Sequence, residues 1–384
     1  MDFEVVVAGH ICLDIIPEMH GPPPEEPGTL VEVGPATLST GGAVGNAGLA
    51  LHVIGVPTAL MGKIGDDPLG RALQEVIARF DPQLTRYLII APGESSSYTV
   101  VINPPNIDRS FLHCPALNNT FSSSDIPYDQ VAKARLFHFG YPVLMRRTYE
   151  DQGAELCAMF RRAKEVGVTT SLDVGPPDPR VVGHVDWARI MRSTLPYVDV
   201  FVPSADELQF VLDRRSFENK VPLTTHVIAD LGQESIRMGA KVVVIKCGDR
   251  GFYLRTASQE SFKSFGRAIP ANEGDWADRE MWSPCFVPDV FAGTTGTGDA
   301  TIAGFIAALL RGCSVSDTAT FACAVGACCV EAPNAIGGIR SWEETWNRVR
   351  RGWRRAKFQP DEEGWRHDAL TSLWVGPRDG RRVG

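Results

Sequence analysis

The chain has 384 residues, of which 44% are hydrophobic, and its 38 basic and 46 acidic residues give a formal net charge of −8. This length can bury a large core in one long domain or in several shorter ones. The negative charge, with basic residues scattered except between Arg348 and Lys357, argues against a nucleic-acid partner.

The cysteines and the apolar stretches indicate the compartment. Nine cysteines stand at irregular spacings, and several lie in apolar runs such as Phe321 to Val330. This pattern is typical of reduced core thiols in a reducing compartment. The acidic start, Met1 to Glu4, does not resemble an export signal, and no apolar run reaches the roughly 20 residues that span a bilayer. We therefore expect a cytoplasmic protein without a membrane partner.

In chain order, Phe3 to Gly9 predicts the first strand, and Thr58 to Gly65 predicts the next. Apolar residues at helical spacing between Leu69 and Phe80 predict a helix after that strand. Two segments, approximately 15–40 and 92–115, break this rhythm and look extended. We expect them to form a small β flap, or lid, over the edge of the main sheet, where active sites of open α/β sheets lie.

The middle of the chain continues the alternation of strands and helices. Further strands are predicted at Ala134 to Tyr141, Val168 to Val174, Asp199 to Pro203 and Lys241 to Gly248. Several of them are apolar without alternation, which is typical of strands covered on both faces. Repeated strand, helix, strand units predict an α/β fold with a mainly parallel central sheet and helices on both faces.

The segment from Gly293 to Asp299 is a Gly-rich turn that opens an apolar helix from Ala300 to Gly312. Free backbone N–H groups and the positive dipole end at such a helix start stabilise anions, and glycine allows phosphate to approach closely. An acidic residue in the first turn is also, in itself, merely a favourable helix charge.

This segment resembles the C-terminal signature of the ribokinase-like, phosphofructokinase-B (PfkB) type carbohydrate kinases, in which D-T-x-G-A-G-D precedes a helix. Gly296, Gly298 and Asp299 match the signature, whereas Thr297 stands where alanine is usual and Gly293 where the first aspartate is usual. The second departure puts the monovalent-cation site of the family in doubt.

Other stretches resemble the same family in the same order along the chain. Near the N-terminus these are Asp14, after the first strand, and the run from Gly41 and Gly42 to Asn46 and Ala47. Further on they are Glu207 in an N-x-x-E motif whose asparagine is replaced by Ser204, the turn containing Lys246, Gly248 and Gly251, and Asn334 in the loop 332–338.

The resemblance implies a ribokinase-like three-layer sandwich that transfers phosphate from ATP to a hydroxyl of a sugar or sugar-like molecule. It implies Asp299 as the base, with Gly296, Thr297 and Gly298 as the anion hole. The acceptor would bind Asp14, Gly41, Gly42 and Asn46, and the nucleotide Lys246, Gly248, Gly251 and Asn334. Glu207 would hold Mg²⁺ through water.

Two alternatives stay open: a nucleoside kinase of the adenosine type, and a catalytically silent ligand-binding regulator on the same scaffold. We expect residues 1–358 to form the kinase domain and 359–384 a peripheral C-terminal extension. A homodimer formed through the lid is the expected assembly.

Overall fold

The computed structural model describes residues 3–24, 26–105 and 109–381, so residue 25 and residues 106–108 of the expected lid lie outside the described part. A ten-stranded sheet runs through the centre of the molecule in the order β15-β16-β14-β13-β12-β11-β10-β9-β1-β4. Its strands are β1 (Val5–Gly9), β4 (Thr58–Met61), β9 (Leu136–Gly140), β10 (Thr169–Asp173), β11 (Val200–Phe201), β12 (Val242–Lys246), β13 (Phe252–Thr256), β14 (Glu280–Ser283), β15 (Arg366–Asp368) and β16 (Leu373–Val375).

The six strands from β4 to β12 are parallel, and the remaining four are antiparallel to their neighbours. The apolar run of β1 shows why this part of the sheet has helices on both faces. Val5 and Val7 belong to one apolar core, and Val6 and Ala8 belong to another on the opposite face. Successive side chains of a strand point to opposite faces, so an unbroken apolar strand requires cover on both.

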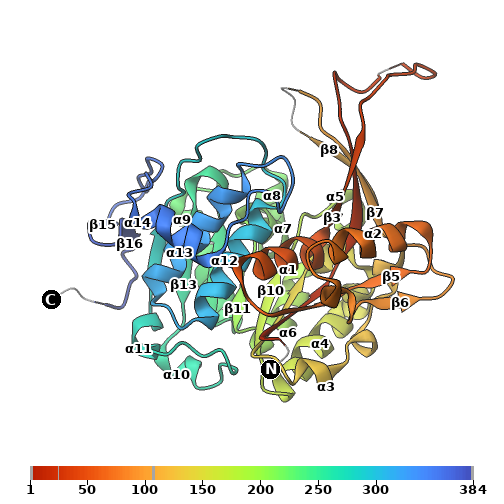
Figure 1. Cartoon of the computed structure of the whole chain (residues 1–384). Helices are drawn as coiled ribbons and strands as arrows, with labels where there is room; N and C mark the ends of the chain where they lie inside the picture. The colour runs from red at the N-terminus through yellow and green to blue at the C-terminus, as the bar shows by residue number, and fades with distance from the viewer. Residues whose placement is uncertain (1–2, 25, 106–108, 382–384) are drawn as a thin grey trace.

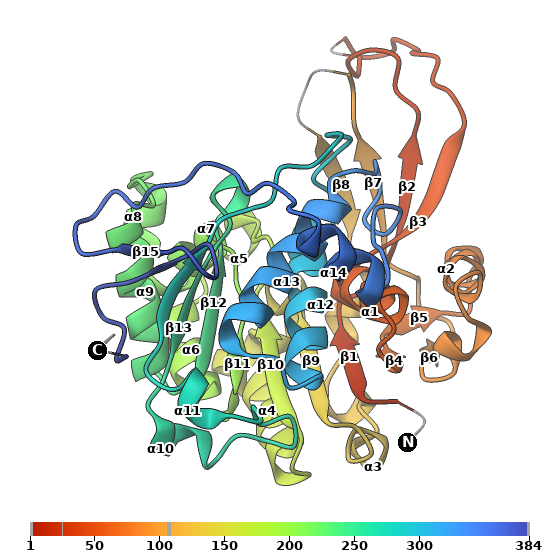
Figure 2. The ribbon, with the colours of Figure 1, turned by 60° about the vertical axis from the view of Figure 1, so that its left-hand side comes forward.

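Helices provide that cover and complete the three layers (Figures 1 and 2). One face carries α1 (Gly42–Ile54), α12 (Thr297–Leu310) and α13 (Val315–Cys329), with α14 (Trp342–Arg350) packed on α13, and α2 (Pro68–Ala78) lies near the lid. The other face carries α3 (Tyr128–Val131), α4 (Ala154–Glu165), α6 (Trp187–Thr194), α7 (Ala205–Leu212) and α9 (Thr225–Arg237). The short helices are α5 (Pro179–Val182), α8 (Arg214–Glu218), α10 (Gln259–Phe262) and α11 (Glu273–Trp276).

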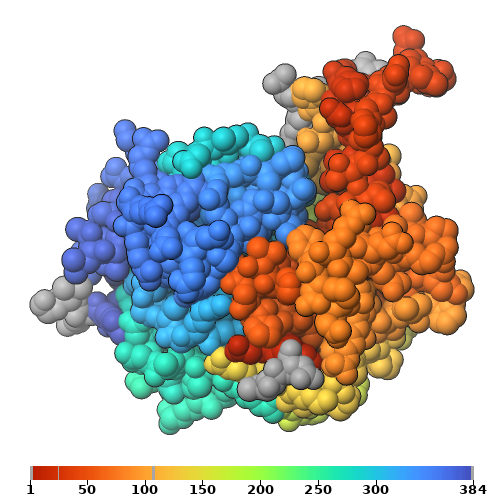
Figure 3. Space-filling view, viewed as in Figure 1, coloured from red at the N-terminus to blue at the C-terminus, as the bar shows by residue number. Residues whose placement is uncertain are grey.

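A four-stranded sheet, the lid, stands out from the body (Figures 1 and 3). Its order is β3-β2-β7-β8, formed by β2 (Cys12–Pro17), β3 (Ala36–Gly41), β7 (Tyr98–Ile102) and β8 (Ser110–Cys114). The lid thus combines two segments that are far apart in the sequence. Its strands β2 and β7 are parallel, and each pairs with an antiparallel strand at the edge of the lid.

Two regions differ from the arrangement expected from the sequence, namely the predicted strand from Thr58 to Gly65 and the C-terminal extension 359–384. The stretch from Thr58 to Gly65 is not one strand, because the chain leaves the main sheet at Gly62 and β5 (Lys63–Gly65) pairs with β6 (Ile89–Ala91). The C-terminal segment places β15 and β16 at the edge of the main sheet. None of the helices in the described part of the chain combines the length and apolar character needed to cross a membrane.

Candidate active site

Polar side chains meet at the carboxyl edge of the parallel strands. Asp173 is the last residue of β10, Lys246 is the last residue of β12, and Tyr141 directly follows β9. Ser204 and Glu207 belong to the segment that follows β11 and begins α7. In open parallel sheets, ligands bind at this edge because the loops that follow several strands converge there.

Asp299 lies in the first turn of α12, which starts directly after the Gly-rich turn. Gly296 precedes the helix with a φ of 75°, a left-handed conformation that glycine adopts without strain. A Cβ atom at this position would lie 2.3 Å from the Cβ of Ala335, so the loop 332–338 packs directly on the turn. The turn therefore requires glycine for its conformation and for this contact.

The carboxylate of Asp299 is buried, with 3% of its residue surface exposed, and one of its oxygens is held on two sides. Asn46 Nδ2 donates to Oδ2 at 3.0 Å, and the hydroxyl of Tyr141 donates to the same oxygen at 2.7 Å. Oδ1 makes no hydrogen bond to any described residue. One oxygen is thus fixed while the other is buried without a partner, and the residue lines a cavity.

Burial raises the pKa of Asp299 above its usual value, although the hydrogen bond from Tyr141, the charge of Lys246 and the hydrogen bond from Asn46 oppose the rise. A carboxylate with a raised pKa is a stronger proton acceptor, provided that it is ionised.

A buried ion pair lies beside Asp299. Lys246 Nζ contacts Asp173 Oδ1 at 2.8 Å, and the two side chains are 11% and 1% exposed. Burial alone would lower the pKa of Lys246, but Asp173 and Glu207 raise it, so this ammonium is charged. The same ammonium would be 3.6 Å from a Cβ placed on Gly298, which puts a positive charge next to the start of α12.

Glu207 completes a group of three carboxylates around this one ammonium. Its Oε2 accepts a hydrogen bond from the backbone N–H of Ser204 at 2.7 Å, within a capping box that begins α7. Burial and the neighbouring charge of Asp173 raise its pKa to about 7, against the opposing effect of Lys246. When ionised, Asp173, Glu207 and Asp299 carry more negative charge than Lys246 neutralises. Such an oxygen-rich, anionic donor set fits a hard divalent cation such as Mg²⁺.

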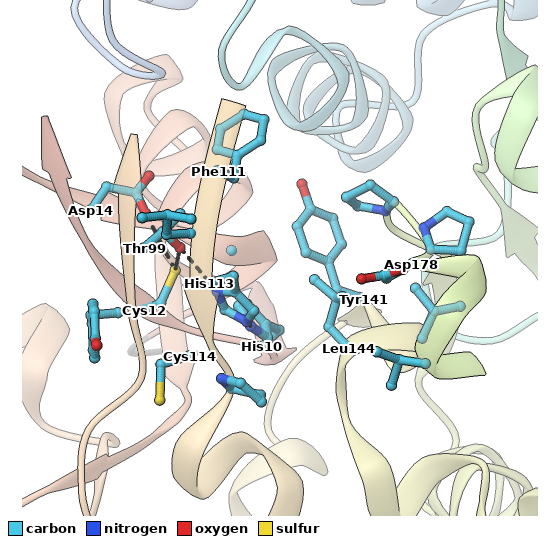
Figure 4. A pocket seen from close by; sticks show the side chains of 18 of the residues that line it. His10, Cys12, Asp14, Thr99, Phe111, His113, Cys114, Tyr141, Leu144 and Asp178 are labelled. Carbon is cyan, nitrogen blue, oxygen red and sulfur yellow. Dashed lines mark hydrogen bonds between the residues drawn. The ribbon is translucent and has the colours of Figure 1, made fainter. Parts of the chain in front are cut away.

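A cavity of about 870 Å³ opens between this edge and the lid (Figure 4). Asp14 from β2 and Asn46 from α1 line it together with Asp299. Gly41 and Gly42, at the start of α1, allow the neighbouring side chains to approach closely. A Cβ on Gly41 would lie 2.2 Å from Asp14 Oδ1, and one on Gly42, whose φ is +78°, would lie 2.4 Å from His10 Nδ1.

The remaining predicted site residues lie in loops near the same edge. Gly248 and Gly251 form the turn after β12, with φ values of 61° and 94°. Asn334 accepts hydrogen bonds from the backbone N–H groups of Ile336 and Gly337, at 3.1 Å and 2.6 Å, and shapes the loop that packs on Gly296. Thr297 is the first residue of α12.

The structure adds residues that the sequence motifs do not identify. Tyr141 is a non-glycine residue with a φ of 68°, and such strained conformations cluster at functional sites. Arg109 of the lid region donates to Thr294 Oγ1 at 2.5 Å and so connects the lid to the Gly-rich turn. His10, Cys12 and His113 also line the cavity. Each depends on contacts between distant segments, which no local pattern encodes.

Comparisons with known proteins identify the family and the fold. The chain matches the pattern of the pfkB family carbohydrate kinase over residues 2–342. It is 24% identical over 293 residues to an uncharacterized sugar kinase of Archaeoglobus fulgidus, covering 76% of this chain and 98% of that relative. It is 23% identical over 345 residues to fructokinase-2 of Oryza sativa subsp. japonica, covering 87% of this chain and 90% of the relative.

The fold is similar to the solved structure of Arabidopsis thaliana ribokinase complexed with ribose and ATP. The TM-score is 0.67 at 20% identity, with 90% of this chain and 98% of that chain covered. This similarity confirms the predicted ribokinase-like α/β sandwich with a lid. Because the family pattern covers most of the sequence, the chain belongs to the pfkB family of carbohydrate kinases.

Proposed function

We propose that this carbohydrate kinase transfers the terminal phosphoryl group of ATP to a hydroxyl of a sugar or polyol, with Asp299 as the proton acceptor. The observation that supports this proposal most directly is the asymmetric environment of the Asp299 carboxylate. Oδ2 is held by Asn46 and Tyr141, whereas Oδ1 has no partner and the residue lines the cavity. A substrate hydroxyl in that cavity would donate to Oδ1 and lose its proton there as the phosphoryl group arrives.

The start of α12 and Lys246 supply positive potential for the transferred phosphoryl group. Phosphoryl transfer depends mainly on positioning and on neutralising charge over the phosphate oxygens. The backbone N–H groups of Gly296 to Gly298 lie at the positive end of the helix dipole, and the Lys246 ammonium lies beside them. When bound, Mg²⁺ would neutralise phosphate charge, and Glu207 with Asp173 are the residues that would hold it.

The acceptor side of the cavity suits hydroxyl groups. Asp14 is 8% exposed, and burial raises its pKa to about 6, so it is mostly ionised at neutral pH. An ionised carboxylate accepts charge-assisted hydrogen bonds from hydroxyls. A sugar is the acceptor of the ribokinase complex and of the fructokinase relative by their names. The lid strand β2 carries Asp14, so closing the lid would position the acceptor against Asp299.

A nucleoside is the second candidate acceptor. The cavity volume of about 870 Å³ lies in the range of sites that enclose drug-sized ligands. Beyond the polar groups, its wall includes apolar residues, namely Val143, Leu144, Pro176, Pro177 and Val181. A base attached to a ribose would pack on that wall, whereas a free sugar would leave it in contact with water. A catalytically silent regulator is the third candidate. Such a protein would have no use for a carboxylate oxygen without a partner, like Oδ1 of Asp299, beside the cavity.

The test compares wild type with Asp299→Asn while a panel of sugars, polyols and nucleosides is screened for acceptor-dependent conversion of ATP to ADP. We expect the variant to lose about 10²- to 10⁴-fold in turnover and to keep its ATP affinity, because only the proton acceptor is removed. Asp178→Asn is the matched control, since Asp178 lines the same cavity but pairs with Arg180. Near-normal turnover in Asp299→Asn would remove Asp299 from this role.

A further inference from the structure

Three metal-binding side chains meet in the cavity beside the proposed acceptor site. His10 follows β1, Cys12 begins β2 of the lid, and His113 lies in β8 of the lid. One ligand atom from each lies within 4.8 Å of the other two. All three line the cavity, so an ion from solution can reach them (Figure 4).

The spacing of the two imidazoles is that of ligands on one ion. His10 Nε2 and His113 Nε2 are joined by a hydrogen bond of 3.2 Å, so the two atoms already face each other. Two nitrogens that each lie about 2.0–2.1 Å from a tetrahedral zinc ion are about 3.3 Å from each other. A thiolate at about 2.3 Å from the same ion would be about 3.6 Å from each nitrogen, so Cys12 needs to approach by no more than about 1.2 Å.

The surroundings also suit a bound ion. Burial lowers the pKa of both imidazoles, with a further effect of His113 on His10, so both are neutral near pH 7 and offer lone pairs. His113 Nδ1 lies 3.0 Å from Thr99 Oγ1, a partner of the kind that orients a metal-binding histidine through its second nitrogen. The Cys12 thiol donates to Asp14 Oδ1 at 3.4 Å, which adds negative charge next to the site. Burial and this charge raise the pKa of the thiol, so the thiolate forms only as the ion displaces its proton.

We propose that His10, Cys12 and His113 form a site for a borderline divalent cation of the Zn²⁺ class. This donor set of two imidazoles and one thiol excludes Mg²⁺, which prefers oxygen ligands, and so separates the site from the carboxylates around Lys246. Binding would release the thiol proton, whereas the proton between the two imidazoles would move to the Nδ1 atom of the ring that carries it, so that both Nε2 atoms can bind the ion. Because the thiol proton is released, affinity would rise with pH.

A cation at this place would block the acceptor. Asp14 is the proposed anchor for the acceptor hydroxyls, and its carboxylate contacts Cys12. An ion and an acceptor would thus compete for one end of the cavity. This consequence, inhibition of the kinase by zinc, rests on the proposed function, whereas the site itself does not.

The experiment therefore measures binding without ATP, Mg²⁺ or acceptor. Full-length, reduced and chelator-treated protein is titrated with Co²⁺ and followed by absorption, and Zn²⁺ is then added as competitor. We expect a thiolate-to-cobalt charge-transfer band that saturates at one equivalent and disappears with one equivalent of Zn²⁺. Cys12→Ser should abolish the band and weaken Zn²⁺ binding about tenfold or more, and His113→Gln should weaken binding to a similar extent.

Cys114→Ser is the matched control, because Cys114 follows His113 and lines the same cavity but points away from the cluster (Figure 4). It should bind Co²⁺ and Zn²⁺ like wild type. Thermal melts establish whether each variant is folded. If Cys12→Ser is not folded, His113→Gln provides the test of Zn²⁺ binding. The proposal is overturned if wild type shows no charge-transfer band, if folded Cys12→Ser and His113→Gln bind Zn²⁺ normally, or if Cys114→Ser loses the band.

Discussion

Replacing Tyr141 by phenylalanine removes one of the two hydrogen bonds that hold Oδ2 of Asp299. A hydrogen bond to a charged group contributes about 1.5–3 kcal/mol, and about 1.4 kcal/mol corresponds to a tenfold change in an ionisation constant. The bond from Tyr141 lowers the pKa of Asp299, against the raising effect of burial, so its loss should make the carboxylate harder to ionise. We therefore expect the acidic limb of the kcat/KM profile to move toward alkaline pH by about one to two pH units.

The assay is the pH dependence of kcat/KM for the acceptor that the substrate screen identifies. At pH values above the acidic limbs of both proteins, the variant should approach the wild-type rate within a few fold, because Asp299 is then ionised in each of them. Tyr149→Phe is the matched control: Tyr149 lines the same cavity, but its ring packs on Trp187, and within the described residues its hydroxyl makes no hydrogen bond to a carboxylate. A rate that falls equally at all pH values, with an unmoved acidic limb, would refute the assigned role of Tyr141.

Four further predictions concern the metal, the acceptor and the monovalent ion. Glu207→Gln should raise the Mg²⁺ concentration that gives half-maximal rate more than it alters acceptor KM, as steady-state titrations of both would show. Asp14→Ala should weaken acceptor binding by about ten- to a hundredfold and leave ATP binding intact, measured by calorimetry. In wild type, burial raises the pKa of Asp14 to about 6, so acceptor affinity should fall as the pH drops through about 6. Because Gly293 has no side-chain oxygen, replacing K⁺ by a bulky organic cation should change the rate only weakly, and a tenfold loss would contradict this.

The sequence predicted the family and the parallel half of the sheet because both depend on local patterns. The apolar strands β1, β9, β10 and β12 carry their own signal, and the Gly-rich turn before Asp299 is a contiguous motif. The antiparallel strand β13 has no such clear signal, since its apolar run is only three residues long and ends before Arg255 and Thr256. Its place in the sheet depends on pairing with β12 and β14.

The site was predictable only where its residues belong to motifs. Asp173 lies near the end of the strand that the sequence predicts at Val168 to Val174, but its ion pair with Lys246 becomes visible only when β10 and β12 end at the same edge. Tyr141 reaches Asp299 across 158 positions of the chain, and its positive φ is a property of the folded backbone. Such contacts depend on tertiary packing, which single-sequence patterns do not contain.

The position of β16 has a consequence for how the chain reaches its folded state. β16 pairs with β14, and Asp379 forms an ion pair with Arg279 at 2.9 Å, so residues about a hundred positions apart meet at this edge. During synthesis, β14 leaves the ribosome long before its partner and exposes an unpaired strand edge in the interval. A chain shortened before β16 would keep that edge open permanently and offer it to other chains. The hairpin of β15 and β16 therefore covers the edge of β14 and makes the short β15 the outer strand, although this hairpin lies outside the family pattern.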